Sequence, residues 1–162
     1  MGARIYRPYA SDIPEIMGLM KRAHARSRYA EKCGVDVRQG KAVLLNAMFT
    51  DMEKDDTTVV LIAKNDEGEI VGIIAGARRP LYEALTLYMA MDVIFVVDEW
   101  APADAAGKLL DAFHDWATRP EGTVILRHGV NDAIADPDRV AVLFRRRGFR
   151  QAGYLFEKEV TT

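Results

Sequence analysis

Cysteine is almost absent from this chain of 162 residues, and long apolar runs are also missing. The single Cys33 excludes an internal disulfide framework and a cysteine-rich zinc site. The longest apolar run, residues 85–97, is interrupted by Thr86 and Asp92 and is too short to span a bilayer. Residues 1–12 lack the apolar core of a signal peptide. We therefore expect a soluble, cytoplasmic protein.

A charge excess of one sign is also missing, because the formal net charge is only -2. This balance gives no general attraction to nucleic acid or anionic membranes. The densest basic cluster follows the last predicted helix and comprises Arg145, Arg146, Arg147 and Arg150. Cations at a helix C-terminus are favoured by the helix dipole, so a solvated helix end is the simpler interpretation and an acidic partner is the alternative. The three histidines share no metal-like spacing, and we expect neither nucleic-acid binding nor a metal site.

The sequence is otherwise typical of a globular protein, with 49% apolar and 28% charged residues. Its length favours one domain over residues 1–162. The first half predicts a short strand at 3–9, a helix after Ser11 and a second helix over 37–53. An antiparallel meander follows, with strands at 57–64, 69–77 and 85–97 and a break at Arg78-Arg79-Pro80.

The second half alternates helices and strands. Residues 104–117 predict an amphipathic helix, and the strand at 123–130 follows this crossover, so it should lie parallel to 85–97. Asp136-Pro137 starts a helix that stops at Gly148, and 149–160 should form a last strand or hairpin. The predicted fold class is α/β (α+β), with a mixed, mostly antiparallel central sheet flanked by helices on both faces.

This order of elements resembles the GNAT superfamily, the Gcn5-related N-acetyltransferases, over nearly the whole chain. Residues 107–117 (GKLLDAFHDWA) resemble the helix after the acetyl-CoA loop of that family, and 142–160 resemble its C-terminal segment. Residues 66–76 (DEGEIVGIIAG) resemble GNAT-like proteins of tailed phages and prophages. The resemblance implies a GNAT-type domain with acetyl-CoA as its cofactor if the protein is active. It also suggests a host-cytoplasmic protein that is incorporated in a phage particle.

The loop that would hold acetyl-CoA departs from the family pattern. Its basic or amide position is Ala101, its first glycine is Asp104 and its last small position is Ala106. Two unit charges about 4 Å apart repel by about 1 kcal/mol in water and about 4 kcal/mol at a dielectric of 20, so the carboxylate would oppose a diphosphate. Alternatively, Asp104 simply stabilises the first helical turn after Pro102. The resemblance assigns these positions to cofactor binding: Val96, Asp98, Ala101, Ala103, Asp104 and Ala106.

The catalytic positions of the family are also altered. The tyrosine that protonates the departing thiolate corresponds to Phe144, and a family asparagine corresponds to Pro137. Asp92 is the one ionisable residue on the long strand, so it is the candidate general base if the protein is active. Otherwise we expect Asp92 to face solvent or to pair with an arginine.

Two functions are consistent with these residues. We favour a degenerate GNAT-like protein that binds no acetyl-CoA and serves as a phage-type accessory or virion component. Its partner would be another protein or a second copy, and residues 152–160, with Tyr154 and Phe156, could supply an edge strand. The alternative is an active acetyl-CoA-dependent N-acetyltransferase acting on an unknown amine. Ala101, Asp104 and Phe144 are the residues that discriminate between them.

Overall fold

The protein is built around a mixed five-stranded sheet in the order β1-β2-β3-β4-β5. The computed structural model describes residues 2–52, 57–119, 124–130, 133 and 136–158. The first four strands are antiparallel neighbours, and β5 lies parallel to β4, as the sequence predicts. The strands are β1 (Arg4–Tyr6), β2 (Thr58–Lys64), β3 (Ile70–Pro80), β4 (Tyr88–Val97) and β5 (Val124–Arg127).

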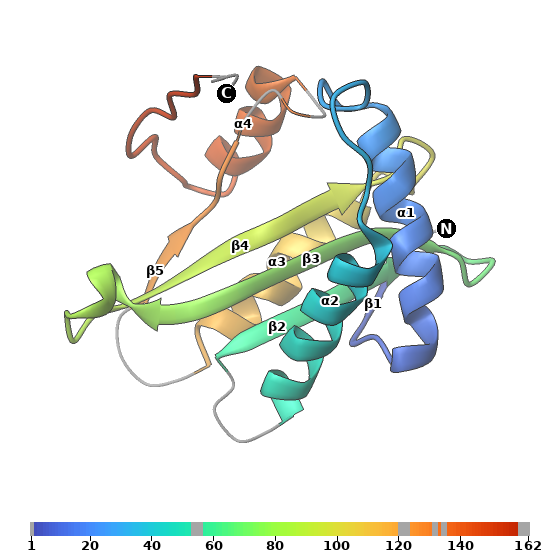
Figure 1. Ribbon diagram of the computed structural model, residues 1–162. Coiled ribbons are helices and arrows are strands. Elements are labelled where there is room, and N and C mark those ends of the chain that lie inside the picture. The colour runs from blue at the N-terminus through green and yellow to red at the C-terminus, as the bar shows by residue number, and fades with distance from the viewer. Residues whose placement is uncertain (1, 53–56, 120–123, 131–132, 134–135, 159–162) are drawn as a thin grey trace.

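Helices cover both faces of the sheet (Figure 1), which confirms the predicted fold class. One face carries α1 (Ile13–Ala25) and α2 (Val37–Met52), and the other carries α3 (Ala105–Ala117) and α4 (Pro137–Arg145). Short 3-10 turns occupy Ala10–Asp12 and Leu81–Glu83. No helix in the described part of the chain is both long enough and apolar enough to cross a membrane.

Side-chain alternation along β2 explains the two layers. Val60 and Ile62 are buried against the α1 and α2 side, whereas Val59, Leu61 and Ala63 are buried against α3. Both faces of this central strand are therefore covered, and its sequence is continuously apolar rather than alternating.

The sheet becomes irregular near the end of the β4–β5 ladder. Ala75 pairs with Ile94 and Gly76 with Asp92, which leaves Val93 as a bulge in β4. The parallel pairing joins Tyr88–Met91 to residues 124–127 and then stops. Asp92 and His128 therefore follow directly on the last paired residues, where the two strands separate.

The structure corrects several predicted boundaries: β1 ends at Tyr6 rather than at residue 9, and β4 begins at Tyr88 rather than at residue 85. Strand β3 does not break at Arg78 but continues to Pro80, because the Arg78 amide donates to Thr57 and the ladder to β4 persists. Strand β5 is shorter than predicted and ends at Arg127, although residue 123 lies outside the described residues.

A further correction concerns the C-terminal segment. Residues 149–158 form no strand or hairpin in the structure, and 159–160 lie outside the described residues. The segment is held instead by Glu157, whose carboxylate accepts hydrogen bonds from Arg28 and Tyr29. The side chains of 150–158 remain exposed, so no apolar face drives this part onto the sheet, whereas Phe149 is half-buried and packs against the core.

Candidate functional site

The loop between β4 and α3 begins with a buried ion pair. The Asp98 side chain is only 3% exposed and accepts a hydrogen bond from Arg22 Nε at 2.8 Å. Arg26 lies 3.6 Å from the other carboxylate oxygen. Because Arg22 belongs to α1 and Arg26 directly follows that helix, Asp98 anchors the loop to the α1 face and its charge is compensated there.

Asp104 makes different contacts from those the sequence suggests. It precedes α3 rather than lying within its first turn, and its carboxylate does not cap the helix. The oxygens accept a hydrogen bond from the Ala3 amide at 3.0 Å and pair with Lys108 Nζ at 2.7 Å. The Lys108 ammonium and, to a smaller extent, the Ala3 amide hold the pKa of the Asp104 carboxyl below its usual range. The charge of this carboxylate is thus compensated by Lys108, and the side chain joins the N-terminal segment to α3.

The remaining predicted cofactor positions do not share one surface. Val96 is 8% exposed and packs on the α1 and α2 side. Ala101 packs against the opposite core, Ala103 is exposed and Ala106 is half-buried in the first turn of α3.

One arginine of the predicted basic cluster approaches this helix end. A Cβ on Gly107 would lie 2.6 Å from Arg147 Nη2, so the guanidinium lies directly over the first turns of α3. Arg147 also donates to Asp111 at 3.1 Å. The other members, Arg145, Arg146 and Arg150, are exposed as a solvated helix end would be. The sequence places Arg147 in the basic cluster but does not predict its contact with α3, because that contact depends on how α4 packs on α3.

A chain of three polar side chains lies where β4 and β5 separate. His128 Nδ1 is 2.8 Å from Asp92 Oδ1, and His128 Nε2 is 2.8 Å from His114 Nε2. The side chains of His128 and Asp92 are 2% and 10% exposed. Burial and, after it, the neighbouring His128 lower the pKa of His114 from 6.5 to about 4. His114 is therefore neutral near pH 7, and one of the two facing imidazole nitrogens must donate the hydrogen bond between them.

Aromatic rings surround this chain. The ring of Phe144, which is 6% exposed, stacks on His128 with centroids 4.8 Å apart. Phe149 contacts His114 and His128, each at 5.3 Å, and Phe113 lies 5.5 Å from His128. We call these five rings the aromatic cluster: Phe113, His114, His128, Phe144 and Phe149.

The sequence predictions captured only part of this arrangement. Asp92 neither faces solvent nor pairs with an arginine, because His128 is its partner. The two histidines gave no sequence signal, since they lie on α3 and after β5 and approach only in the folded protein. The parallel packing of 123–130 on 85–97 was the one available clue, but it did not fix the register. No cluster of three potential metal ligands occurs among the described residues.

Solved structures with a similar fold align with nearly the whole chain. Glucosamine-6-phosphate N-acetyltransferase from Arabidopsis thaliana matches with a TM-score of 0.71 at 10% identity, covering 99% of this chain and 100% of that one. The chain has the GNAT fold. The ribosomal-protein-alanine N-acetyltransferase of Brucella melitensis shares this GNAT fold with a TM-score of 0.66 at 15% identity, covering 99% and 100%.

An aminoglycoside acetyltransferase from an uncultured soil metagenomic sample, solved with sisomicin, also has the GNAT fold. It matches with a TM-score of 0.66 at 17% identity, covering 98% of this chain and 97% of that one. No family model matches the sequence, and no curated protein is significantly similar to it. At these identities the likeness establishes the GNAT fold and leaves the activity to the site.

Proposed function

We propose that this GNAT-fold protein does not transfer acetyl groups and acts as a binding protein. The main support for this proposal is the aromatic cluster, which lies where β4 and β5 separate. By the family resemblance, the departing thiolate would lie near position 144. Here Phe144 has no hydroxyl, and its ring stacks on His128 at 4.8 Å. The protein's own side chains therefore pack together where the reacting end of the cofactor would lie.

The loop supports the same proposal. Ala101 offers no cation, and the nearby guanidinium of Arg147 is shared with Asp111. Asp104 keeps its carboxylate beside the start of α3, although Lys108 compensates its charge. The residues at this helix end therefore do not fit an acetyl-CoA diphosphate, which requires donors and close backbone approach.

The binding surface in this proposal is the C-terminal segment. Tyr154, Leu155 and Phe156 are 83%, 71% and 89% exposed. Strand β5 is the last strand of the sheet as described, so its outer edge lacks a strand neighbour among the described residues. An exposed apolar segment and an unpaired strand edge each favour pairing with another chain. The partner would be a second copy or another protein, and the resemblance to phage-encoded proteins suggests an accessory or virion role.

Calorimetric titration with acetyl-CoA tests the proposal. We expect no binding tighter than about millimolar, which corresponds to about −4 kcal/mol. The double variant Ala101→Arg with Asp104→Gly restores the family loop and should bind no better, because the aromatic cluster remains in place. A micromolar dissociation constant for the unaltered protein would overturn the proposal.

The alternative, an active N-acetyltransferase, is favoured by one observation. Asp92, the candidate base, is linked through His128 to His114, so a proton taken up at the sheet could pass to the half-exposed face of α3. Acetyl transfer to simple amines that is lost in Asp92→Asn but retained in Asp115→Asn would establish this alternative.

A further inference from the structure

One side of the sheet is covered over only part of its width. Helix α2 lies over β2 and α1 over β3, but no described helix lies on this side of β5 or of the first half of β4 (Figure 1). Ala90 and Leu126 pack into the core beneath α3, so the residues that alternate with them point to the uncovered side. We call this surface the open face, and its residues are Arg79, Met89, Met91, Val93, Ile125 and Arg127.

The open face combines apolar side chains with guanidinium groups. Met91 and Val93 are 37% and 70% exposed, and the other two apolar members are half-buried. Arg79 lies 3.8 Å from the exposed Glu83, whereas Arg127 has no carboxylate partner in the described part of the chain. Methionine sulfur and guanidinium groups both make favourable contacts with aromatic rings. The open face therefore suits an aromatic side chain better than an aliphatic one.

The C-terminal segment carries aromatic rings without a covering surface. Tyr154 and Phe156 are 83% and 89% exposed, the highest values of any aromatic side chain among the described residues. Their ring centroids are 6.4 Å apart, so the two rings form one apolar patch. Glu157 ties the segment to Arg28 and Tyr29 of its own molecule. Because both rings stay exposed in this position, the segment does not occupy the open face of its own molecule.

We propose that the open face binds the C-terminal segment of a second copy of this chain, with the two aromatic rings packed on Met91 and Val93. This inference rests on the proposed role of that segment as a binding surface. Two such contacts, made reciprocally, close a symmetric dimer. If each of the four rings buries about 150 Å², the segments and the faces they cover bury about 1,200 Å² in total, the lower limit for specific interfaces. One contact alone buries about half of that area, so both are needed for a stable dimer.

Charged substitutions on the two surfaces test this arrangement by sedimentation equilibrium. Phe156→Lys alters the segment and faces the arginines, and Val93→Glu alters the open face at its most exposed apolar residue. Each variant should raise the dissociation constant of self-association about tenfold or more, because an unpaired charge enters both contacts of its dimer. Val142→Glu is a matched change at a 41% exposed valine of α4 and should leave the dissociation constant unaltered.

Mixing the two variants separates reciprocal contacts from other arrangements. The Phe156→Lys protein keeps an intact open face, and the Val93→Glu protein keeps an intact segment. An equimolar mixture should therefore associate more strongly than either variant alone, because one contact is restored. A mixture that associates no better than its components overturns the proposal.

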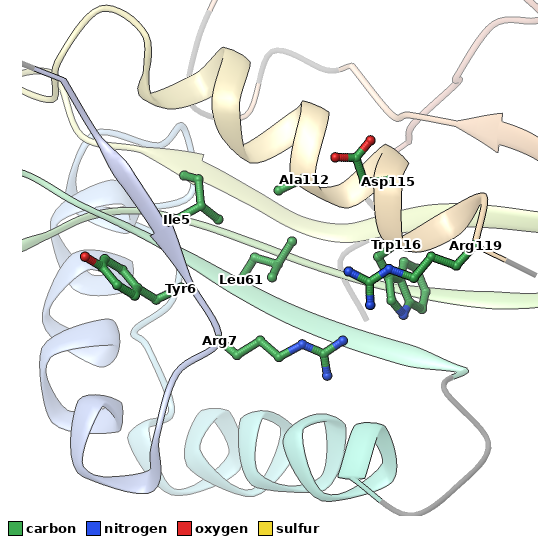
Figure 2. Close-up of a pocket in the computed structure, with 8 residues that line it drawn as sticks. All are labelled: Ile5, Tyr6, Arg7, Leu61, Ala112, Asp115, Trp116 and Arg119. Carbon is green, nitrogen blue, oxygen red and sulfur yellow. The ribbon is translucent and has the colours of Figure 1, made fainter.

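A second pair of variants tests the guanidinium group of the open face. Arg127→Gln should weaken self-association about fivefold or more, since a cation–π contact is lost at each face. Arg119→Gln is the matched control, because Arg119 lines a pocket of about 250 Å³ between β1 and α3 on the other side of the sheet (Figure 2). This pair also serves if Val93→Glu fails to fold by circular dichroism.

The outcomes distinguish this inference from the proposed function. Unaltered self-association of folded Val93→Glu or Arg127→Gln overturns the assignment of the open face, and so does a monomer at every concentration. If Phe156→Lys weakens association and neither open-face variant does, the segment remains a binding surface with a different acceptor. Micromolar binding of acetyl-CoA overturns the proposed function whether or not the dimer forms.

Discussion

Gly76 provides the most demanding test of the packing between sheet and helix. A Cβ at this position would collide with the carbonyl oxygen of Met91 and lie 2.6 Å from the Phe113 ring. The carbonyl belongs to β4 next to the bulge, so it cannot withdraw without shifting Asp92, which pairs with Gly76. Phe113 is fully buried and equally restricted. Gly76→Ala should therefore lower the free energy of unfolding by about 2–3 kcal/mol, the usual cost of overpacking a core.

Gly18 supplies a matched control, because the same substitution there should change the free energy of unfolding in the opposite direction. It lies inside α1, and a Cβ there would meet only Arg22 Nη1, at an ordinary contact distance of 3.6 Å. Gly18→Ala should raise the free energy of unfolding by about 0.5–1 kcal/mol, since alanine loses less backbone freedom in a helix. Equilibrium urea denaturation of both variants measures the difference. Equal or greater stability of Gly76→Ala would refute the close packing of Phe113 on β3.

Two further predictions concern the histidine chain and the C-terminal segment. Burial lowers the pKa of His114 from 6.5 to about 4 in the folded state. The contribution of the neutral His114 ring to the free energy of unfolding is therefore fully present above pH 6.5 and is lost as the pH falls from 6.5 toward 4. The loss should be about 1–2 kcal/mol after allowing for solvent screening of this half-exposed ring. This loss of stability at low pH should be absent in His114→Gln and present in the control His24→Gln. If urea denaturation shows the same dependence on pH for the unaltered protein and both variants, the prediction is contradicted. Separately, sedimentation should show concentration-dependent association that Phe156→Ser weakens and Phe49→Ser does not, and a monomer at all concentrations would contradict self-association through this segment.

The fold was predictable because its evidence is local and repeated along the chain. Helix α3 appears at nearly its predicted bounds, since its apolar residues recur at helical spacing over 13 residues. The meander was likewise visible in the apolar strands and the Asn65–Gly68 turn, where Gly68 takes a φ of 86°. The C-terminal strand was wrongly predicted because Tyr154 and Phe156 favour a strand only if a neighbouring surface accepts them.

The candidate site was less predictable because its contacts are long-range. Nothing in the local sequence indicates that the Asp104 carboxylate would accept a hydrogen bond from the Ala3 amide. Likewise, His114 and His128 meet only because α3 packs on one face of a sheet whose last two strands are parallel. Asp92 was identified correctly as the ionisable residue of β4, but its partner required the three-dimensional register.

The hydrogen bond between Ala3 and Asp104 also bears on the order in which the chain folds. It joins residues 101 positions apart, and β1 itself pairs only with β2 over Arg4–Tyr6. During synthesis on the ribosome, β1 can pair with β2 only after Lys64 has left the exit tunnel, and the Ala3 amide can reach Asp104 only after the start of α3 has followed. The nascent chain therefore exposes Ile5 to solvent and to chaperones until β2 is available, and Ala3 is fixed against α3 only later.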